Sequence, residues 1–179
     1  MNVGALERGT VGFIALALIV SAVFWIRRSR FRYLNLISAT ACLTLILIVL
    51  GAYVRLSDAG LGCPDWPGCY GNLTPAHAME EIRATESVPP GGPVSMAKAW
   101  KEMLHRYLAM IIGALIVAIM LSAWRNRVKW QQSPLLATCI AVAVIFQAAL
   151  GALTDTMLLK PAIVTAHLLG GITILALLI

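Results

Sequence analysis

The sequence predicts an all-α fold, a polytopic transmembrane bundle of about five helices with one long extracytoplasmic loop. Of its 179 residues, 60% are apolar and only 12% are charged, which is about half the charge of a typical soluble domain. The apolar residues are concentrated in five runs, each close to the ~20 residues that cross a bilayer. The charged residues between these runs are also separated by sign.

Each apolar run is expected to be a helix, because backbone groups in lipid must pair within the chain. The runs are Thr10–Ile26, Leu34–Val54, Met103–Trp124, Ser133–Leu153 and Pro161–Ile179. The first is interpreted as a retained helix, since its positive charges follow the apolar residues, whereas those of a signal peptide precede them. A short surface helix is also expected between Thr74 and Glu86.

Basic residues mark the two short connections, one after the first run and one after the third. They are Arg27, Arg28, Arg30, Arg32, Arg125, Arg127 and Lys129, with no acid among them. The positive-inside rule therefore places both connections in the cytoplasm, and the amino terminus and the segment from Arg55 to Lys101 outside it. The net charge of +6 is interpreted as a topology signal beside membrane lipid, with no nucleic acid as a partner.

Four cysteines fall into two pairs. Cys42 and Cys139 lie within apolar runs, where a lone thiol behaves as a small apolar residue. Cys63 and Cys69 lie in the outer segment GLGCPDWPGCYG, where an oxidising compartment favours a disulfide. Zinc is not favoured there, because no further Cys or His flanks the pair at zinc spacing. A structural disulfide is the first interpretation and a redox-active one the alternative.

Two histidines lie near the outer ends of apolar runs, His105 in KEMLHRYLAM and His167 in KPAIVTAHLLGG, while His77 lies in the outer segment. Polar groups within a bilayer are costly and by default mark a functional site; the alternative is a histidine hydrogen-bonded to a neighbouring helix for packing only. Both helices run inward, and the rise per residue puts His105 ~6 Å and His167 ~9 Å below the helix starts. Such a pair suits haem iron, which imidazole commonly ligates in helix bundles.

Further polar residues surround this pair. Glu102 lies three residues before His105 on the same helix face, and its spacing alone favours an interfacial carboxylate exposed to water. Arg55 and Arg106, at the outer boundary, would either snorkel to the headgroups or bind haem propionates. Gln147, deep in its apolar run, needs an interhelical hydrogen bond.

Four segments, GAYVRLSDAGLGCPDWPGCYG, EMLHRYLA, QAALGALTD and TAHLLGG, resemble the haem A synthase family in their order and spacing. The resemblance covers roughly residues 34–179 and corresponds to the amino-terminal half of such enzymes, which consist of two four-helix bundles. It implies that residues 1–33 are an additional helix with its basic loop, and residues 34–179 a haem-binding bundle. The chain departs from the family at Ser57-Asp58, where Thr-Gly is more usual.

The resemblance implies roles for individual residues. His105 and His167 would ligate the haem of this half, Glu102 would be a carboxylate needed for the oxidation, and Cys63 and Cys69 would form the outer-loop pair. The implied reaction converts the C8 methyl of haem O to the formyl of haem A for terminal oxidase biogenesis, with water as the oxygen source. A haem O synthase would supply the substrate, the missing half would hold haem b, and the enzyme would lie in a bacterial or mitochondrial inner membrane.

Two other functions use the same residues. A membrane b-type cytochrome would need both histidines but not Glu102, and a thiol-oxidising relay protein would use Cys63 and Cys69 with a quinone. The chain also ends at Ile179 inside an apolar run. We therefore expect either that it is the front part of a longer protein, or that a homo-oligomer supplies the second half. An isolated half could bind haem without oxidising it.

Overall fold

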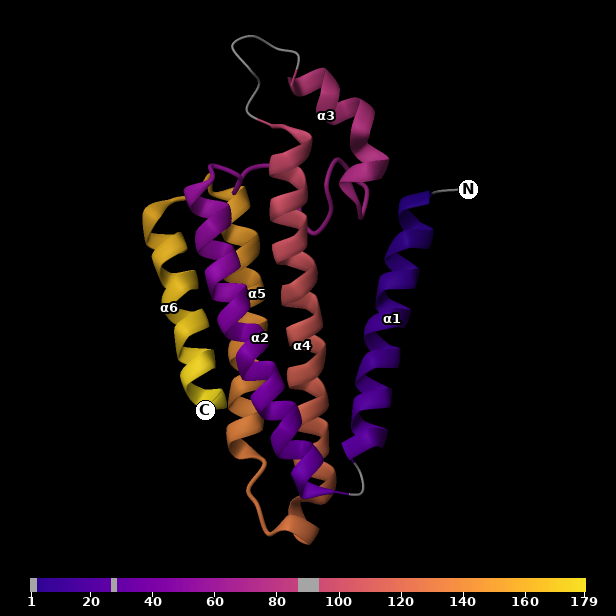
Figure 1. Ribbon diagram of the computed structural model, residues 1–179, viewed down its shortest axis with the longest axis vertical. Helices are drawn as coiled ribbons and strands as arrows, with labels where there is room; N and C mark the ends of the chain where they lie inside the picture. Colours follow the sequence, from indigo (N-terminus) through magenta and orange to yellow (C-terminus); the bar gives the residue numbers. More distant parts are fainter. Residues whose placement is uncertain (1–2, 27–28, 87–93) are drawn as a thin grey trace.

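The computed structural model describes residues 3–26, 29–86 and 94–179, and within them every regular element is a helix. Five long helices follow one another along the chain (Figure 1): α1 Val3–Ile26, α2 Arg30–Leu56, α4 Met96–Trp130, α5 Leu135–Thr156 and α6 Pro161–Leu178. A short 3₁₀ helix, η1 Pro75–Ala78, and α3 Met79–Glu86 stand between α2 and α4. The predicted all-α fold and the predicted surface helix are confirmed.

Four helices, α2, α4, α5 and α6, are long and apolar enough to cross a membrane. The apolar part of α1, Gly12–Ile26, is shorter. The large apolar side chains that point away from the other helices, such as Phe146 and Ile145, are about two-thirds exposed or more, as expected where lipid takes the place of a protein neighbour. The chain is therefore an integral membrane protein.

The four long apolar helices form a ring in which α2 packs on α4, α4 on α5, α5 on α6, and α6 on α2. The two diagonal pairs, α2 with α5 and α4 with α6, make no such packing contact between described residues. Isoleucines from α4, α5 and α6 fill the middle of the ring, namely Ile112, Ile116, Ile140 and Ile174. Helix α1 lies outside the ring and packs mainly on α4 (Figure 1).

The two ends of the ring differ in charge. At one end the start of α2 meets the end of α4, where the Tyr33 and Trp130 ring centroids are 5.0 Å apart, so Arg30 and Arg32 lie near the basic tail of α4. The end of α2, the segment 57–74 that follows it, and α3 lie at the opposite end (Figure 1). Arg27, Arg28 and the sequence Pro89–Pro93 lie outside the described residues. Which end faces the cytoplasm stays a prediction.

Helix α4 begins earlier than its apolar run predicts. It starts at Met96 and not near Lys101, and the Ser95 side chain caps it by accepting a hydrogen bond from the Lys98 N–H at 3.3 Å. Such a cap satisfies one of the unpaired donors of a first turn. The rise per residue then puts His105 ~14 Å from its helix start, so the expected depth of ~6 Å is wrong. The added turns project beyond the ring (Figure 1).

Candidate functional site

The two histidines lie on diagonally opposed helices, His105 on α4 and His167 on α6. The other diagonal supplies a glycine beside each ring. A Cβ atom added to Gly51 of α2 would lie 2.8 Å from Cε1 of His105, and one added to Gly151 of α5 would lie 3.4 Å from Cε1 of His167. Each imidazole ring therefore occupies the space that a side chain would fill if the glycine beside it were a larger residue.

Within the described residues, the Nδ1 atoms of His105 and His167 are buried and have no hydrogen-bond partner. Native proteins leave few buried polar groups in that condition. The alternative, a histidine hydrogen-bonded to a neighbouring helix for packing only, gains no support from these two atoms. Two buried imidazoles whose Nδ1 atoms have no protein partner, each beside a glycine, fit a pair of residues that would hold a haem by its iron.

Gln147 makes the interhelical hydrogen bond that its position predicted. Its Nε2 donates to the backbone carbonyl of His167 at 2.9 Å and so joins α5 to α6. The amide lies directly against Gly170, where an added Cβ would come within 1.9 Å of Nε2. Gln147 and Gly170 thus fix the position of α6 along α5, and with it the position of His167 relative to Gly151.

Glu102 lies one turn outward from His105 and is buried, with 4% of its surface exposed. Its Oε2 accepts a hydrogen bond from the Cys63 backbone N–H at 3.0 Å, and its Oε1 forms an ion pair with Arg106. The expectation of a water-exposed carboxylate is wrong. The physical reason is that the segment carrying Cys63 folds back over the outer part of α4, which spacing along one helix cannot reveal.

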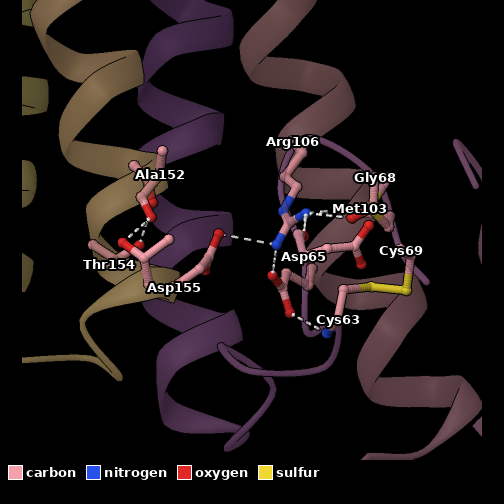
Figure 2. Close-up of polar contacts among 12 residues, drawn as sticks. Cys63, Asp65, Gly68, Cys69, Met103, Arg106, Ala152, Thr154 and Asp155 are labelled. Atoms are coloured by element: carbon pink, nitrogen blue, oxygen red, sulfur yellow. Dashed lines mark hydrogen bonds and ion pairs between the residues drawn. A yellow bond between two sulfur atoms is a disulfide. The ribbon is translucent and has the colours of Figure 1, made fainter. Parts of the chain in front are cut away.

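Arg106 is the centre of a polar network at this end of the ring (Figure 2). Its Nη1 donates to the carbonyls of Asp65 at 2.8 Å and Gly68 at 2.7 Å, while Nη2 contacts Glu102 and, at 3.0 Å, Asp155 Oδ2 of α5. The side chain is only 10% exposed, so it does not snorkel to the headgroups. The expected contact with a propionate stays a prediction, and the guanidinium is occupied here by protein oxygens.

Cys63 and Cys69 form a disulfide, as the sequence predicted, and both are buried. The disulfide segment, residues 63–71, is held in several further ways. Asp65 accepts hydrogen bonds from the backbone N–H groups of Tyr70 and Gly71, and the backbones of Cys69 and Asn72 pair with each other. The segment therefore has a defined shape over the outer end of α4.

Arg55 lies in the last turn of α2, one turn beyond Gly51, and is exposed at the same end of the ring. After it, Asp58 adopts the left-handed conformation, with φ of 52°, which glycine adopts freely and which Asp tolerates. Lys98 lies 2.9 Å from this carboxylate, and its hydrogen bond and charge hold the pKa of Asp58 below the usual range. The departure at Ser57-Asp58 thus leaves the turn intact.

Sequence reasoning missed Asp155. This residue lies in the last turn of α5, one turn beyond Gly151, and has no role in the site that the sequence predicts. The four-residue spacing from Gly151 would have placed both residues on one helix face. Nothing in the sequence, however, showed that Arg106 of another helix would meet it.

Comparison with known proteins identifies relatives. The COX15-CtaA family, described as cytochrome oxidase assembly protein, matches residues 34–179. A haem A synthase of Shewanella oneidensis is 43% identical over 145 residues, which are 80% of this chain and 43% of that protein. A protohaem IX farnesyltransferase 1 of Natronomonas pharaonis is 30% identical over 151 residues, 81% of this chain and 26% of that protein.

A haem A synthase of Alkalihalophilus pseudofirmus is 28% identical over 110 residues, 60% of this chain and 31% of the relative. The chain thus spans less than half the length of these curated relatives. No solved structure matches it significantly. The matched family region begins after α1, the helix that packs outside the ring.

Proposed function

The chain belongs to the COX15-CtaA family of cytochrome oxidase assembly proteins, and on that basis we propose that it acts in haem A synthesis. The proposed reaction oxidises the C8 methyl of haem O to the formyl of haem A. It takes one oxygen atom from water and releases protons and electrons, the electrons passing to an external acceptor. Support comes from the 43% identity to a haem A synthase. Neither the cytochrome nor the thiol relay is favoured by the matched relatives.

The observation that carries the proposal is the histidine pair on diagonal helices, with a glycine beside each ring. His105 and His167 would hold the substrate haem by its iron, which supplies the redox chemistry when bound. Because Gly51 and Gly151 have no side chains, the imidazole rings of His105 and His167 can lie against α2 and α5. Arg55, exposed one turn outward, would bind a propionate through charge-assisted hydrogen bonds; Arg106 would do so only by giving up protein partners.

Glu102 is proposed as the catalytic carboxylate. The Cys63 N–H and Arg106 hold it one turn from His105 without a contact to bulk water. A fixed negative charge in a buried site stabilises positive charge that develops nearby far better than one in water. Glu102 would therefore stabilise charge at the reacting methyl carbon, or accept a proton released there.

The complete enzyme would contain a second bundle that holds haem b, either in a longer chain or in a homo-oligomer. It would lie in the inner membrane of a bacterium or mitochondrion, with the disulfide segment outside the cytoplasm. A haem O synthase would supply the substrate.

Replacing Glu102 tests the proposal. Glu102→Gln keeps the size of the side chain and its ability to accept the Cys63 N–H, but removes the charge. In the assembled enzyme this variant should load haem normally and fail to complete haem A. Mass analysis of extracted haem should then show that haem O or a hydroxylated intermediate accumulates.

Glu80→Gln is the matched control, since Glu80 is an exposed acid of α3 and its variant should make haem A like the wild type. Normal haem A yields from Glu102→Gln would remove Glu102 from the mechanism. If the wild-type assembly made no haem A at all, the electron-carrying cytochrome would become the better interpretation.

A further inference from the structure

The site has two layers along the ring. The inner layer contains the histidines and the glycines beside them. The outer layer lies one helical turn away and is charged, because Glu102 precedes His105 on α4 and Asp155 follows Gly151 on α5. Arg106 joins the two carboxylates of this outer layer (Figure 2).

Two carboxylates therefore share one guanidinium away from water. The side chains of Glu102, Arg106 and Asp155 are only 5%, 10% and 13% exposed. Charges interact far more strongly in such surroundings than at a surface. Because one guanidinium faces two carboxylates, it cannot neutralise both, and the cluster keeps a net negative charge.

Asp155 also supplies the one contact that this network makes with α5 among the described residues. The other partners of Arg106 belong to α4 or to the disulfide segment, through the carbonyls of Asp65 and Gly68. Through its contact with Arg106, Asp155 thus connects α4, which carries Glu102, to α5. Helix α5 in turn contacts the His167 ring at Gly151.

We propose that Asp155 is a positioning residue for Glu102, acting through Arg106. It holds the guanidinium from the α5 side and shares its charge, so that Glu102 keeps both its place and an incompletely neutralised negative charge. This role rests on the proposed function of Glu102. Asp155 itself touches Arg106 and is not assigned a contact with the substrate.

The first test compares Asp155→Asn with Asp155→Glu in the assembled enzyme. Asp155→Asn keeps the size of the side chain but leaves Arg106 to neutralise Glu102 fully. We expect unchanged haem content and KM, with kcat lowered about 10- to 100-fold, the usual effect of losing a supporting partner. Asp155→Glu restores the charge and should recover most of kcat.

Asp58→Asn is the matched control. Asp58 forms an ion pair of nearly the same length at the same end of the ring, 2.9 Å to Lys98, but its side chain is 86% exposed. This variant should have wild-type kcat. Wild-type kcat in Asp155→Asn would overturn the proposal. The proposal would also be overturned if Asp155→Asn lost both haem and kcat and Asp155→Glu recovered neither. That result would indicate that Asp155 acts in folding alone.

A second test needs no turnover. Arg106 holds the disulfide segment, so loosening Arg106 should expose the Cys63–Cys69 bond to reductant. In the purified full chain, dithiothreitol should reduce this bond several-fold faster in Asp155→Asn than in wild type or Asp58→Asn. Equal rates would overturn the proposal. If the wild-type assembly made no haem A, the proposed function would fail, while this measurement would still decide whether Asp155 holds Arg106.

Discussion

At the scale of single residues, the position of the His105 ring requires that residue 51 have no side chain. A Cβ at this position would lie 2.8 Å from His105 Cε1, closer than carbon atoms pack, whereas at Gly151 the corresponding distance is 3.4 Å. Gly51→Ala should therefore displace the His105 ring and weaken haem binding, and Gly151→Ala should do so less. Titration of the purified chain with haem, followed by absorption spectroscopy, measures both effects.

Gly113→Ala is the control for this prediction, because its Cβ would meet only Val144 at an ordinary 3.8 Å. All three substitutions add about 1 kcal/mol of helix propensity, so a difference among them reports the histidine contacts. Wild-type affinity in Gly51→Ala would show that the His105 ring does not depend on this glycine.

Single residues also show where sequence reasoning ends. His105 and His167 could be found because a polar group in an apolar run is conspicuous. Burial of Glu102 and Arg106 could not, because it depends on the disulfide segment, which is distant in the sequence and packs on them only in three dimensions. Asp155 was missed for the same reason.

At the scale of elements, the disulfide segment is the part whose structure has the most redundant support. The chain-entropy model gives about 2–3 kcal/mol for closing so short a loop, but hydrogen bonds from Arg106 and to Asp65 also hold it. Replacing Cys63 and Cys69 together by Ser should lower the free energy of unfolding by about that amount and leave some haem A formation.

The matched control replaces Cys42 and Cys139 by Ser, since both are free and lie elsewhere. It should retain full activity. Thermal unfolding and haem extraction measure the two outcomes. Complete loss of turnover in folded, haem-loaded Cys63/Cys69 variant would instead favour a redox role for the pair.

The helices themselves were well predicted, because length and hydropathy determine which segments can cross a bilayer. Their ends were predicted less well. The outer turns of α4 contain Lys98 and Lys101 and carry no continuous apolar signal, yet the Ser95 cap and packing against the disulfide segment extend the helix to Met96.

At the scale of the whole molecule, the site is formed by a ring of four helices in which the histidines occupy one diagonal and the glycines the other. Hydrophobic patterns predict such helices, but they do not say which ones become diagonal neighbours. The basic residues of the two short connections, in contrast, could be placed at one end of the bundle from the sequence alone.

The central claim is that His105 and His167 together bind one haem. The most direct measurement is the absorption spectrum and haem content of the purified chain as wild type, His105→Ala, His167→Ala and, as the surface control, His77→Ala. Wild type and His77→Ala should show a low-spin bis-imidazole spectrum, and each of the other two variants should lose it. An unchanged spectrum and haem stoichiometry in both His105→Ala and His167→Ala would contradict the claim.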